Sequence, residues 1–242
     1  MADWDLPGES SGEPPEPAVP PRVLVLAGDL EPELIWQNEL GGLTYRIGDR
    51  YLKWNPRSTG IVLEREARRL EWISQRHPAP RVLEFGADGE AEWLLTAALP
   101  GGYAVGDQWR ARSAEAIAAI ATGLHAIHAL PIEEFPIEWR DEAWLERQPA
   151  NLGPRPPIVD AVVVHGDACA PNTLITDDGS WSGNVDFGDL GVGDRWADLA
   201  VASMSLDWNF GEGHQDEFYA AYGIEPDEER IQYYRALWDQ ES

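Results

Sequence analysis

Three oxygen-bearing side chains, Asp167, Asn172 and Asp186, follow one another around a strand, loop and hairpin pattern. Asp167 and Asn172 lie five residues apart on a polar loop after the apolar run 161–164, and a hairpin then returns the chain to Asp186. Phosphoryl transfer needs a carboxylate that orients and deprotonates the attacking hydroxyl, and oxygen ligands for Mg²⁺ on the nucleotide phosphates. The spacing therefore predicts that these side chains converge on one metal-phosphate centre.

Aspartate and asparagine also favour turns for structural reasons, and this explanation suffices for Asp178 in the hairpin turn. The set of three, in that order and on those elements, favours a functional centre instead. His165 is expected to orient the loop by hydrogen bonding rather than to act as a base, because Asp167 already has that role. Cys169 is expected to be a small buried side chain, since no base is placed to activate it.

The chain contains 17 arginines and a single lysine, Lys53. A lysine retained where arginine otherwise provides the positive charge indicates a need for a compact ammonium group, as in gripping nucleotide phosphates. A carboxylate on the next helix would hold it in place, and Glu66 is the candidate, with Glu64 as the alternative. Lys53 follows a glycine-containing turn at 39–44, whose candidate nucleotide contacts are Gly41, Gly42 and Thr44.

Hydrophobic periodicity and turn residues indicate the elements that carry these groups. The expected strands are 34–36, 43–47, 51–54, 81–86, 92–96 and 161–164, and the expected helices are 59–75 and 113–130. The first five strands are typical of an antiparallel hairpin sheet. Breaks in composition divide the chain into a disordered, acidic, Pro-rich tail (1–21), an N-terminal part (22–99) and a C-terminal part (100–242). Because the N-terminal part holds Lys53, it is expected to be a nucleotide-binding lobe, and because the C-terminal part holds Asp167, Asn172 and Asp186, it is expected to be a catalytic and substrate-binding lobe.

Composition limits the partners. The 242 residues carry a formal net charge of −25, and residues 141–242 hold 21 acidic but only five basic residues. This charge argues against a nucleic-acid partner and suits a cationic ligand. The lone cysteine and the absence of a leader-like or membrane-spanning apolar run lead us to expect a cytoplasmic protein without a membrane partner. We also expect a monomer or weak dimer. The twelve tryptophans are interpreted as core and interface residues, and His125 and His128 as helix packing rather than a zinc site.

Taken together, these residues resemble the aminoglycoside phosphotransferases, in particular their aminoglycoside 3'-phosphotransferase branch. The resemblance covers about residues 30–240. It is carried by residues 38–44, Lys53, 65–67, 93–96, Pro100-Gly101, 124–131, 165–172, 194–200 and Tyr233-Tyr234. It implies an α+β, two-lobe, protein-kinase-like fold, with an N-terminal antiparallel sheet plus helix and a mostly helical C-terminal lobe.

The resemblance also implies roles for individual residues. Lys53 and Glu66 would grip the phosphates of ATP, Asp167 would be the catalytic base, and Asn172 and Asp186 would bind Mg²⁺. Backbone groups near Ala97 and Leu99 would contact the adenine, and Asp198 would brace the catalytic loop. A protein kinase is disfavoured, because the chain runs from 186–188 directly into 194–200 without an Ala-Pro-Glu motif.

The implied activity is transfer of the ATP γ-phosphate to a hydroxyl of a cationic aminoglycoside, most simply the 3'-hydroxyl, which would confer resistance. Two departures from the family's pattern affect the choice of substrate. Asp189 stands where relatives often have arginine, and the segment 131–161 is shorter than the helical insertion usual in the family. Asp207, Asp239 and Glu142 are the candidate substrate carboxylates. The alternatives are the same fold acting on another small alcohol, such as choline, homoserine or a macrolide, and a non-catalytic nucleotide-binding pseudokinase.

Overall fold

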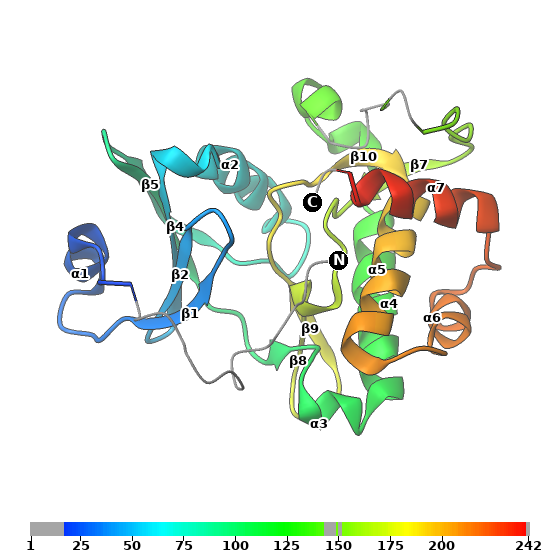
Figure 1. Ribbon diagram of the computed structural model, residues 1–242, viewed down its shortest axis with the longest axis horizontal. Helices are drawn as coiled ribbons and strands as arrows, with labels where there is room; N and C mark the ends of the chain where they lie inside the picture. The colour runs from blue at the N-terminus through cyan, green and yellow to red at the C-terminus, as the bar shows by residue number, and fades with distance from the viewer. Residues whose placement is uncertain (1–16, 143–148, 150–151, 241–242) are drawn as a thin grey trace. The chain divides into compact units, whose positions relative to one another are not determined.

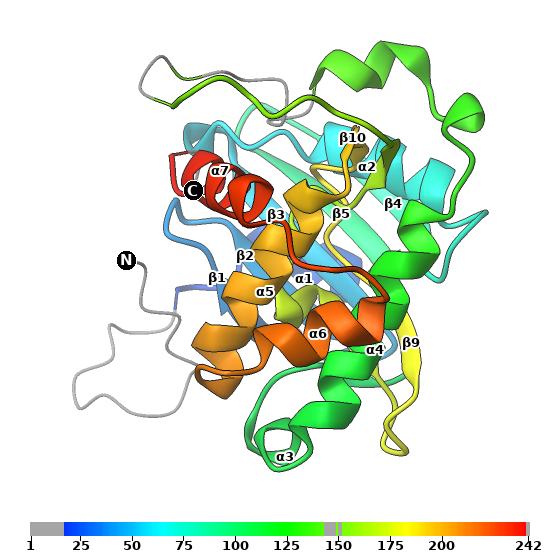
Figure 2. The ribbon, with the colours of Figure 1, turned by 90° about the vertical axis from the view of Figure 1, so that its right-hand side faces the viewer.

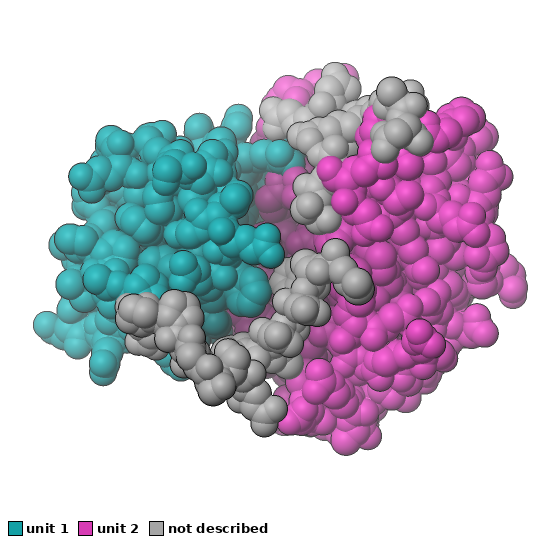
Figure 3. Space-filling view, in the orientation of Figure 1, with its two compact units in different colours: residues 1–71, 80–98 teal, residues 72–79, 99–242 magenta. Residues whose placement is uncertain are grey.

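A computed structural model describes residues 17–142, 149 and 152–240 of the chain. It divides into two compact units, each described by itself below. Unit 1 comprises residues 1–71 and 80–98, and unit 2 comprises residues 72–79 and 99–242, coloured teal and magenta in Figure 3. Most of the disordered tail predicted for residues 1–21 lies outside the described residues.

Unit 1 is built on a five-stranded antiparallel sheet in the order β1-β2-β3-β5-β4 (Figure 1). Its strands are β1 (Glu33–Gln37), β2 (Leu43–Ile47), β3 (Arg50–Pro56), β4 (Val82–Ala87) and β5 (Ala91–Ala97). Alternation along β2 places Leu43, Tyr45 and Ile47 in the core. The antiparallel sheet predicted from the sequence is therefore confirmed, with every strand boundary within two residues of its predicted position.

A short helix, α1 (Pro21–Ala27), precedes this sheet and was not predicted. Proline at its first position suits a helix start, because the missing N–H has no intrahelical partner there. Val23 and Ala27 are one turn apart and are buried in the same core cluster as Tyr45 and Ile47 of β2. The helix is only seven residues long, so its periodicity in the sequence is too brief to identify it.

The helix α2 (Leu63–Ile73) begins four residues later than the predicted start at residue 59. The preceding residues form a single 3₁₀ turn, η1 (Arg57–Thr59), and Gly60 then adopts a left-handed conformation with φ 72°. A left-handed residue interrupts a right-handed helix, so periodicity overestimated its length. Residues 63–71 of α2 belong to unit 1 and residues 72–73 to unit 2.

Unit 2 is mainly helical (Figure 2). Its helices are α3 (Asp107–Arg110), α4 (Ser113–His128), α5 (Trp196–Phe210), α6 (Gln215–Tyr222) and α7 (Glu228–Trp238), with short 3₁₀ turns η2 (Ile132–Glu134), η3 (Ile137–Glu142) and η5 (Ala170–Asn172). The predicted helix 113–130 is confirmed as α4, two residues shorter at its end. Gly123 lets α4 approach the strand β9 (Trp181–Asn184) closely, because a Cβ there would lie 2.8 Å from both Asn184 Oδ1 and Trp181 Nε1.

Two small antiparallel sheets carry the loops of unit 2. One pairs β7 (Ala161–Val164) with β10 (Gly191–Asp194), and the other has the order β6-β8-β9, formed by β6 (Gly102–Tyr103), β8 (Thr173–Ile175) and β9 (Trp181–Asn184). The predicted strand 161–164 is confirmed. Within the described ranges, none of the helices has the length and apolar character needed to cross a membrane.

Candidate active site

The loop that follows β7 carries Asp167, and its turn depends on the preceding residue, Gly166. This glycine has φ 87°, and a Cβ at its position would lie only 2.1 Å from the backbone oxygen of Asp189. Both the left-handed backbone and the close approach exclude a larger side chain. Gly166 therefore allows the chain to turn sharply just before Asp167.

A buried carboxylate, Asp198 on the first turn of α5, holds this loop from beneath. Its two oxygens accept hydrogen bonds from the backbone N–H groups of His165 (2.6 Å) and Gly166 (2.9 Å), and Oδ2 also accepts one from His128 Nε2 (2.9 Å). His128 Nδ1 in turn accepts from the Tyr222 hydroxyl (2.7 Å). The bracing role expected for Asp198 agrees with these contacts, whereas the part played by His128 and Tyr222 was not anticipated.

These donors determine the charge of Asp198. Burial by itself would raise its pKa, but the hydrogen bonds donated by His128 and by the backbone N–H of Gly166 outweigh burial, so the pKa is lowered. A carboxylate that accepts several N–H bonds is stabilised in its ionised form. Asp198 is therefore a charged anchor under the catalytic loop.

His165 connects the two sides of the loop. Its Nδ1 accepts from the backbone N–H of Asp167 (3.3 Å), so Nε2 carries the proton and donates to Val185 O (2.9 Å). The ring is buried against Phe187, with 4.7 Å between ring centroids. Because both ring nitrogens bind backbone groups, the geometry favours the orienting role that the sequence indicated.

Asp167 and Asn172 are joined directly. Asn172 Nδ2 donates to both the backbone oxygen and the Oδ2 of Asp167, each at 2.9 Å. Since both bonds use the amide nitrogen, Oδ1 is the Asn172 atom that can coordinate a metal. The structure thus brings together two of the three groups whose spacing was noted in the sequence.

The remaining oxygen of Asp167, Oδ1, is buried and accepts no hydrogen bond from the described residues. Burial raises the pKa of Asp167, and the negative charge of Asp186 raises it further. An acceptor of this kind is suited to receive a proton from a hydroxyl.

Asp186 has an uncommon backbone. Among the described residues it is the one non-glycine residue with a positive φ, 65°. The preceding residue is fixed on both sides, because Val185 N donates to Asn172 O (3.0 Å) while Val185 O accepts from His165. Left-handed backbone costs about 1 kcal/mol or more and is frequent at functional sites. These contacts bring Asp186 back to the loop of Asp167 and Asn172, as the sequence predicted.

Cys169 lies on the same loop and is buried, as expected. Burial raises the pKa of its thiol, and the charge of Asp167 raises it further. The thiolate is the reactive form of cysteine, so this environment opposes a nucleophilic role.

The strand that leads to Asp186 is fixed by a buried polar cluster. Asn184 Oδ1 contacts His77 Nε2 (3.0 Å) and accepts from Trp181 Nε1 (3.1 Å), and its amide donates to Thr173 Oγ1 (3.1 Å). Burial lowers the pKa of His77 to about 4, an effect only partly offset by the hydrogen bond with Asn184. His77 is therefore neutral at physiological pH.

This pKa predicts a pH dependence of stability. Between pH 6.5 and 4 the unfolded chain binds a proton at His77 that the folded chain does not, so the free energy of unfolding falls as pH falls through this window. From pH 7.5 to 5 we expect His77 to contribute a loss of about 2 kcal/mol. Urea unfolding of His77→Gln should show a correspondingly smaller loss over the same range. Identical pH dependence in both proteins would contradict the prediction.

In unit 1, Lys53 and Glu66 form the ion pair that the sequence predicted. Lys53 Nζ lies 2.8 Å from Oε1 and 2.9 Å from Oε2 of Glu66. Glu66 is buried in the first turn of α2, whereas the alternative candidate Glu64 is exposed. Thr44 pairs with Lys53 in the register of β2 and β3. The structure thus selects Glu66 as the partner of Lys53.

The turn before β2 is closed by Asn38. Its Oδ1 accepts from the N–H groups of Leu40 (3.1 Å) and Gly42 (2.7 Å). Gly41 has φ 94°, and a Cβ on Gly42 would lie 2.1 Å from Asn55 Oδ1, so both positions require glycine. The nucleotide contacts assigned to Gly41, Gly42 and Thr44 remain a prediction.

The two residues proposed near the adenine lie at the end of β5. Ala97 is the last residue of β5, and its N–H donates to Arg81 O (2.9 Å). Leu99 belongs to unit 2 and packs near Gly183, where a Cβ would lie 2.8 Å from Leu99 Cδ1.

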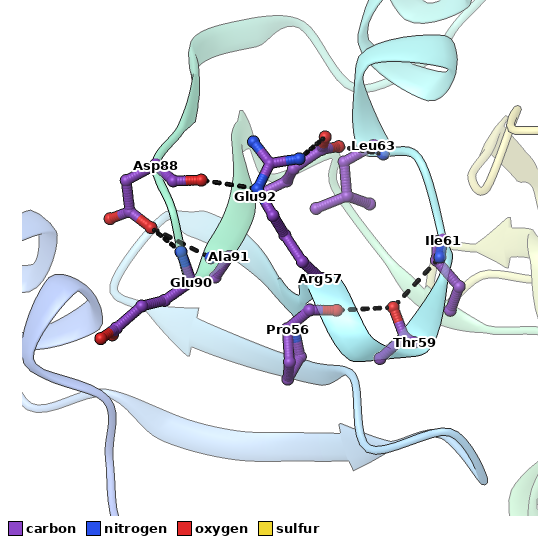
Figure 4. A network of polar contacts seen from close by, with 9 residues as sticks. All are labelled: Pro56, Arg57, Thr59, Ile61, Leu63, Asp88, Glu90, Ala91 and Glu92. Atoms are coloured by element: carbon purple, nitrogen blue, oxygen red, sulfur yellow. Dashed lines mark hydrogen bonds and ion pairs between the residues drawn. The ribbon is translucent and has the colours of Figure 1, made fainter.

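A second carboxylate, Glu92 on β5, fixes the start of α2 (Figure 4). Its Oε2 accepts from the N–H of Leu63 (2.8 Å), and its Oε1 lies 3.5 Å from Arg57 Nη1. Glu92 faces Asn55 of β3 in the sheet register, two residues beyond Lys53. Glu92 therefore ties the first turn of α2, and with it Glu66, to the strand that carries Lys53. Sequence reasoning missed this residue, because helix caps are usually sought next to the helix in the chain.

Replacing Glu92 with alanine is expected to lower the free energy of unfolding by about 1 kcal/mol, the usual cost of losing a helix cap. The KM for nucleotide should rise several-fold, because Glu66 is held less firmly against Lys53. Urea unfolding and steady-state kinetics measure the two effects. Glu90→Ala is the matched control, since Glu90 is exposed in the turn between β4 and β5, two residues before Glu92. Only the backbone of Glu90 takes part in the hydrogen bonds shown in Figure 4. Equal behaviour of the two variants would contradict the role of Glu92.

The candidate substrate carboxylates lie in unit 2. Asp207, near the end of α5, accepts from Gln215 Nε2 (2.5 Å) through Oδ2, while its Oδ1 is buried and accepts no hydrogen bond from the described residues. Asp239 is exposed directly after α7. Glu142 is the last residue of η3, and its side chain lies outside the described part of the chain. Among the described residues no group of three His, Cys, Asp or Glu side chains forms a metal cage.

The chain matches the family model for the phosphotransferase enzyme family over residues 40–156 and 148–237. Together these segments span most of its length and both units. The chain belongs to this family, and the two-lobe α+β kinase-like fold predicted from the sequence is confirmed.

Similar proteins include an aminoglycoside 3'-phosphotransferase of Streptomyces fradiae, 34% identical over 75% of this chain and 81% of the relative. A streptomycin 3''-kinase of Streptomyces griseus is 31% identical over 94% of this chain and 97% of the relative. Among solved structures, aminoglycoside phosphotransferase APH(3'')-Id from Streptomyces rimosus has a TM-score of 0.68 and 27% identity, covering 89% of this chain and 94% of that one. That enzyme has also been solved in complex with ADP and streptomycin. The resemblance to the aminoglycoside phosphotransferases is thereby confirmed.

Proposed function

We propose that this protein transfers the γ-phosphate of ATP to a hydroxyl group of an aminoglycoside and so confers resistance to it. The observation that carries the proposal is the joined set in unit 2, where Asn172 donates two hydrogen bonds to Asp167 and accepts one from Val185, the residue before Asp186. A proton acceptor and two further oxygen donors are what phosphoryl transfer requires of the protein.

In the proposed reaction the hydroxyl oxygen of the substrate forms a bond to the γ-phosphorus of ATP. The bond between that phosphorus and the oxygen bridging to the β-phosphate breaks, and the hydroxyl proton passes to Asp167. The products are a phosphate ester and ADP. Asp167 would orient the hydroxyl as well as accept its proton, because Asn172 fixes Oδ2 while Oδ1 has no hydrogen-bond partner among the described residues.

Mg²⁺ fits the residues present. It binds proteins through one or two carboxylates and oxygen donors together with substrate phosphates, rather than through a complete protein cage. Asp186 and the Oδ1 of Asn172 would hold it, since both hydrogen bonds from Asn172 to Asp167 use the amide nitrogen. When bound, Mg²⁺ would neutralise charge on the nucleotide phosphates.

In unit 1, we assign the nucleotide phosphates to Lys53. Glu66 holds the ammonium group through both carboxylate oxygens, so Lys53 is positioned before nucleotide binds. Gly41, Gly42 and Thr44 are assigned to the nucleotide because they flank Lys53 across β2 and β3, and Ala97 and Leu99 to the adenine. The relative solved with ADP and streptomycin supports a nucleotide substrate.

The acidic charge of the chain supports a cationic second substrate. Relatives named as 3'-phosphotransferases support the 3'-hydroxyl as the acceptor, although a relative that matches 94% of this chain is named a streptomycin 3''-kinase. Asp207, Asp239 and Glu142 are the proposed partners of the substrate ammonium groups. We also propose that the protein acts in the cytoplasm, where ATP is available, as a monomer or weak dimer.

A panel of hydroxyl substrates, with ADP release as the readout, tests this proposal. Kanamycin-like, neomycin-like and streptomycin-like compounds should release ADP, and mass spectrometry of the product should show one added phosphate, whose position NMR locates. Choline, homoserine and a macrolide are the comparison compounds. Turnover of one of these in place of every aminoglycoside would replace the proposal with another small-alcohol kinase. Nucleotide binding without any turnover would replace it with a pseudokinase.

A further inference from the structure

Two tryptophans, Trp208 and Trp238, contact each other at the C-terminal ends of α5 and α7. Their ring centroids lie 5.6 Å apart with an interplanar angle of 41°. Trp208 is 42% exposed, and Trp238 is partly buried. The two helices pack side by side in unit 2 (Figure 2). The tryptophans are expected to be core and interface residues, and the exposure of Trp208 places this pair outside the core.

The position of Trp208 relates it to the catalytic loop. Ser205, three residues earlier on α5, accepts a hydrogen bond from the N–H of Ala170 (2.9 Å) within that loop. Asn209 fixes Ser205 by donating to its backbone oxygen (2.8 Å) and to its hydroxyl (3.3 Å). Residues three and four apart in a helix are neighbours on its surface. Trp208 therefore lies one helical turn beyond the contact between α5 and the loop that carries Asp167.

The position of Trp238 is fixed by Arg235, one turn earlier on α7. Arg235 donates to Ser203 Oγ (2.8 Å) and Ala200 O (3.3 Å) on α5, and to Gln215 Oε1 (2.9 Å) at the start of α6. These bonds attach α7 to α5 immediately before the aromatic pair. The two rings are thus held in place before any ligand binds.

Carboxylates adjoin both rings in the chain. Asp207 precedes Trp208, and its buried Oδ1 accepts no hydrogen bond from the described residues, although Gln215 fixes Oδ2. Asp239 follows Trp238 and is exposed. Indole faces attract cations, and a neighbouring carboxylate adds a charged hydrogen-bond acceptor. Aromatic surface combined with negative charge is the chemistry that recognises an ammonium group on a sugar ring, whose C–H face can lie against an indole.

We propose that Trp208 and Trp238 form an aromatic subsite that binds an ammonium-bearing sugar ring of the second substrate. The inference rests on the proposed function and extends it, because it names aromatic residues, rather than carboxylates alone, as determinants of substrate choice. The subsite selects for positive charge on the ring next to the reacting one, since a neutral ring gains no cation–π attraction.

The test uses the full-length variants Trp208→Ala and Trp238→Ala with the best aminoglycoside of the substrate panel. We expect the KM for the aminoglycoside to rise about tenfold in each. The kcat and the KM for ATP should change less than twofold. Trp208→Phe and Trp238→Phe should recover most of the affinity, because phenylalanine retains an aromatic face. Trp36→Ala is the matched control, since Trp36 is also 42% exposed but lies on β1 of unit 1.

A second measurement separates binding from folding. An analogue with hydroxyl groups in place of the ring amines should give the same KM with wild type and both alanine variants. Unchanged aminoglycoside KM in the alanine variants would overturn the inference, as would parallel changes in kcat and the KM for ATP. Absence of turnover with every aminoglycoside in the wild type would instead overturn the proposed function, and the inference with it.

Discussion

Replacing Asp167 with asparagine is expected to lower kcat by about 10²–10⁴-fold, the usual contribution of a general base. Asparagine preserves the volume of the side chain and can still accept the hydrogen bond from Asn172 Nδ2. It cannot take up the hydroxyl proton. The affinity for nucleotide, measured by calorimetry, should remain within a few-fold of the wild-type value. The variant thus separates proton transfer from nucleotide binding.

Asp177→Asn is the matched control for this prediction. Asp177 is an exposed carboxylate in the hairpin between β8 and β9, in the same unit as Asp167. The change removes one negative charge from the protein, as the Asp167 substitution does, and should leave kcat unchanged. Asp167→Ala should be as inactive as Asp167→Asn. Wild-type turnover in either Asp167 variant would eliminate the proposed mechanism.

Replacing Asp198 is expected to have the largest effect on stability. In Asp198→Ala the N–H groups of His165, Gly166 and His128 lose their acceptor inside the protein. Each buried donor left without a partner costs about 1–3 kcal/mol, so the total is a large part of the 5–15 kcal/mol typical of a domain. The free energy of unfolding from urea titration measures this loss. Because the pKa of Asp198 is lowered on folding, its contribution is present at neutral pH and is lost only in acid.

Asp198→Asn keeps the prediction testable if the alanine variant does not fold. The amide oxygen of the new asparagine can still accept backbone N–H bonds. Its nitrogen, however, replaces an oxygen that accepts from His128 or from the backbone N–H groups of His165 and Gly166, so two donors face each other. We expect a folded protein with kcat lowered at least tenfold and little change in the KM for ATP, because the loop carrying Asp167 is displaced. Asp216→Asn is the control. Both aspartates lie in the first turn of a helix, Asp198 in α5 and Asp216 in α6, but Asp198 is buried and Asp216 is exposed. Equal stability and activity of the two variants would refute the anchoring role.

The start of α2 shows why some elements were predicted only approximately. Periodicity identified the helix, since Leu63, Ala67 and Leu70 recur at helical spacing and are buried. It could not locate the first residue, because this depends on the left-handed Gly60 and on Glu92, which lies 29 residues beyond Leu63 in the chain. The local hydrophobic pattern indicates which face of the helix is buried, whereas the residue that caps its first turn, Glu92, lies on the strand β5.

The residues under the catalytic loop show the same limit. Asp198 and His128 are 70 residues apart, and nothing in their local sequence indicates that they meet. His128 was interpreted as helix packing, which accounts for its burial but not for its two hydrogen bonds. A buried carboxylate finds its donors through the packing of α4, α5 and α6, so its environment is a property of the tertiary structure.

The sequence by itself determined the chemistry available to this protein. The single lysine and the spacing of Asp167, Asn172 and Asp186 define a set of charges and oxygen donors, and strand and helix periods are local properties of the chain. Only the tertiary structure decided that Glu66 rather than Glu64 holds Lys53, that Asp186 adopts a left-handed backbone, and that Trp208 meets Trp238. These outcomes depend on the distances between segments that are remote in the sequence. Those distances are set only when folding packs the buried faces of the helices and strands against one another.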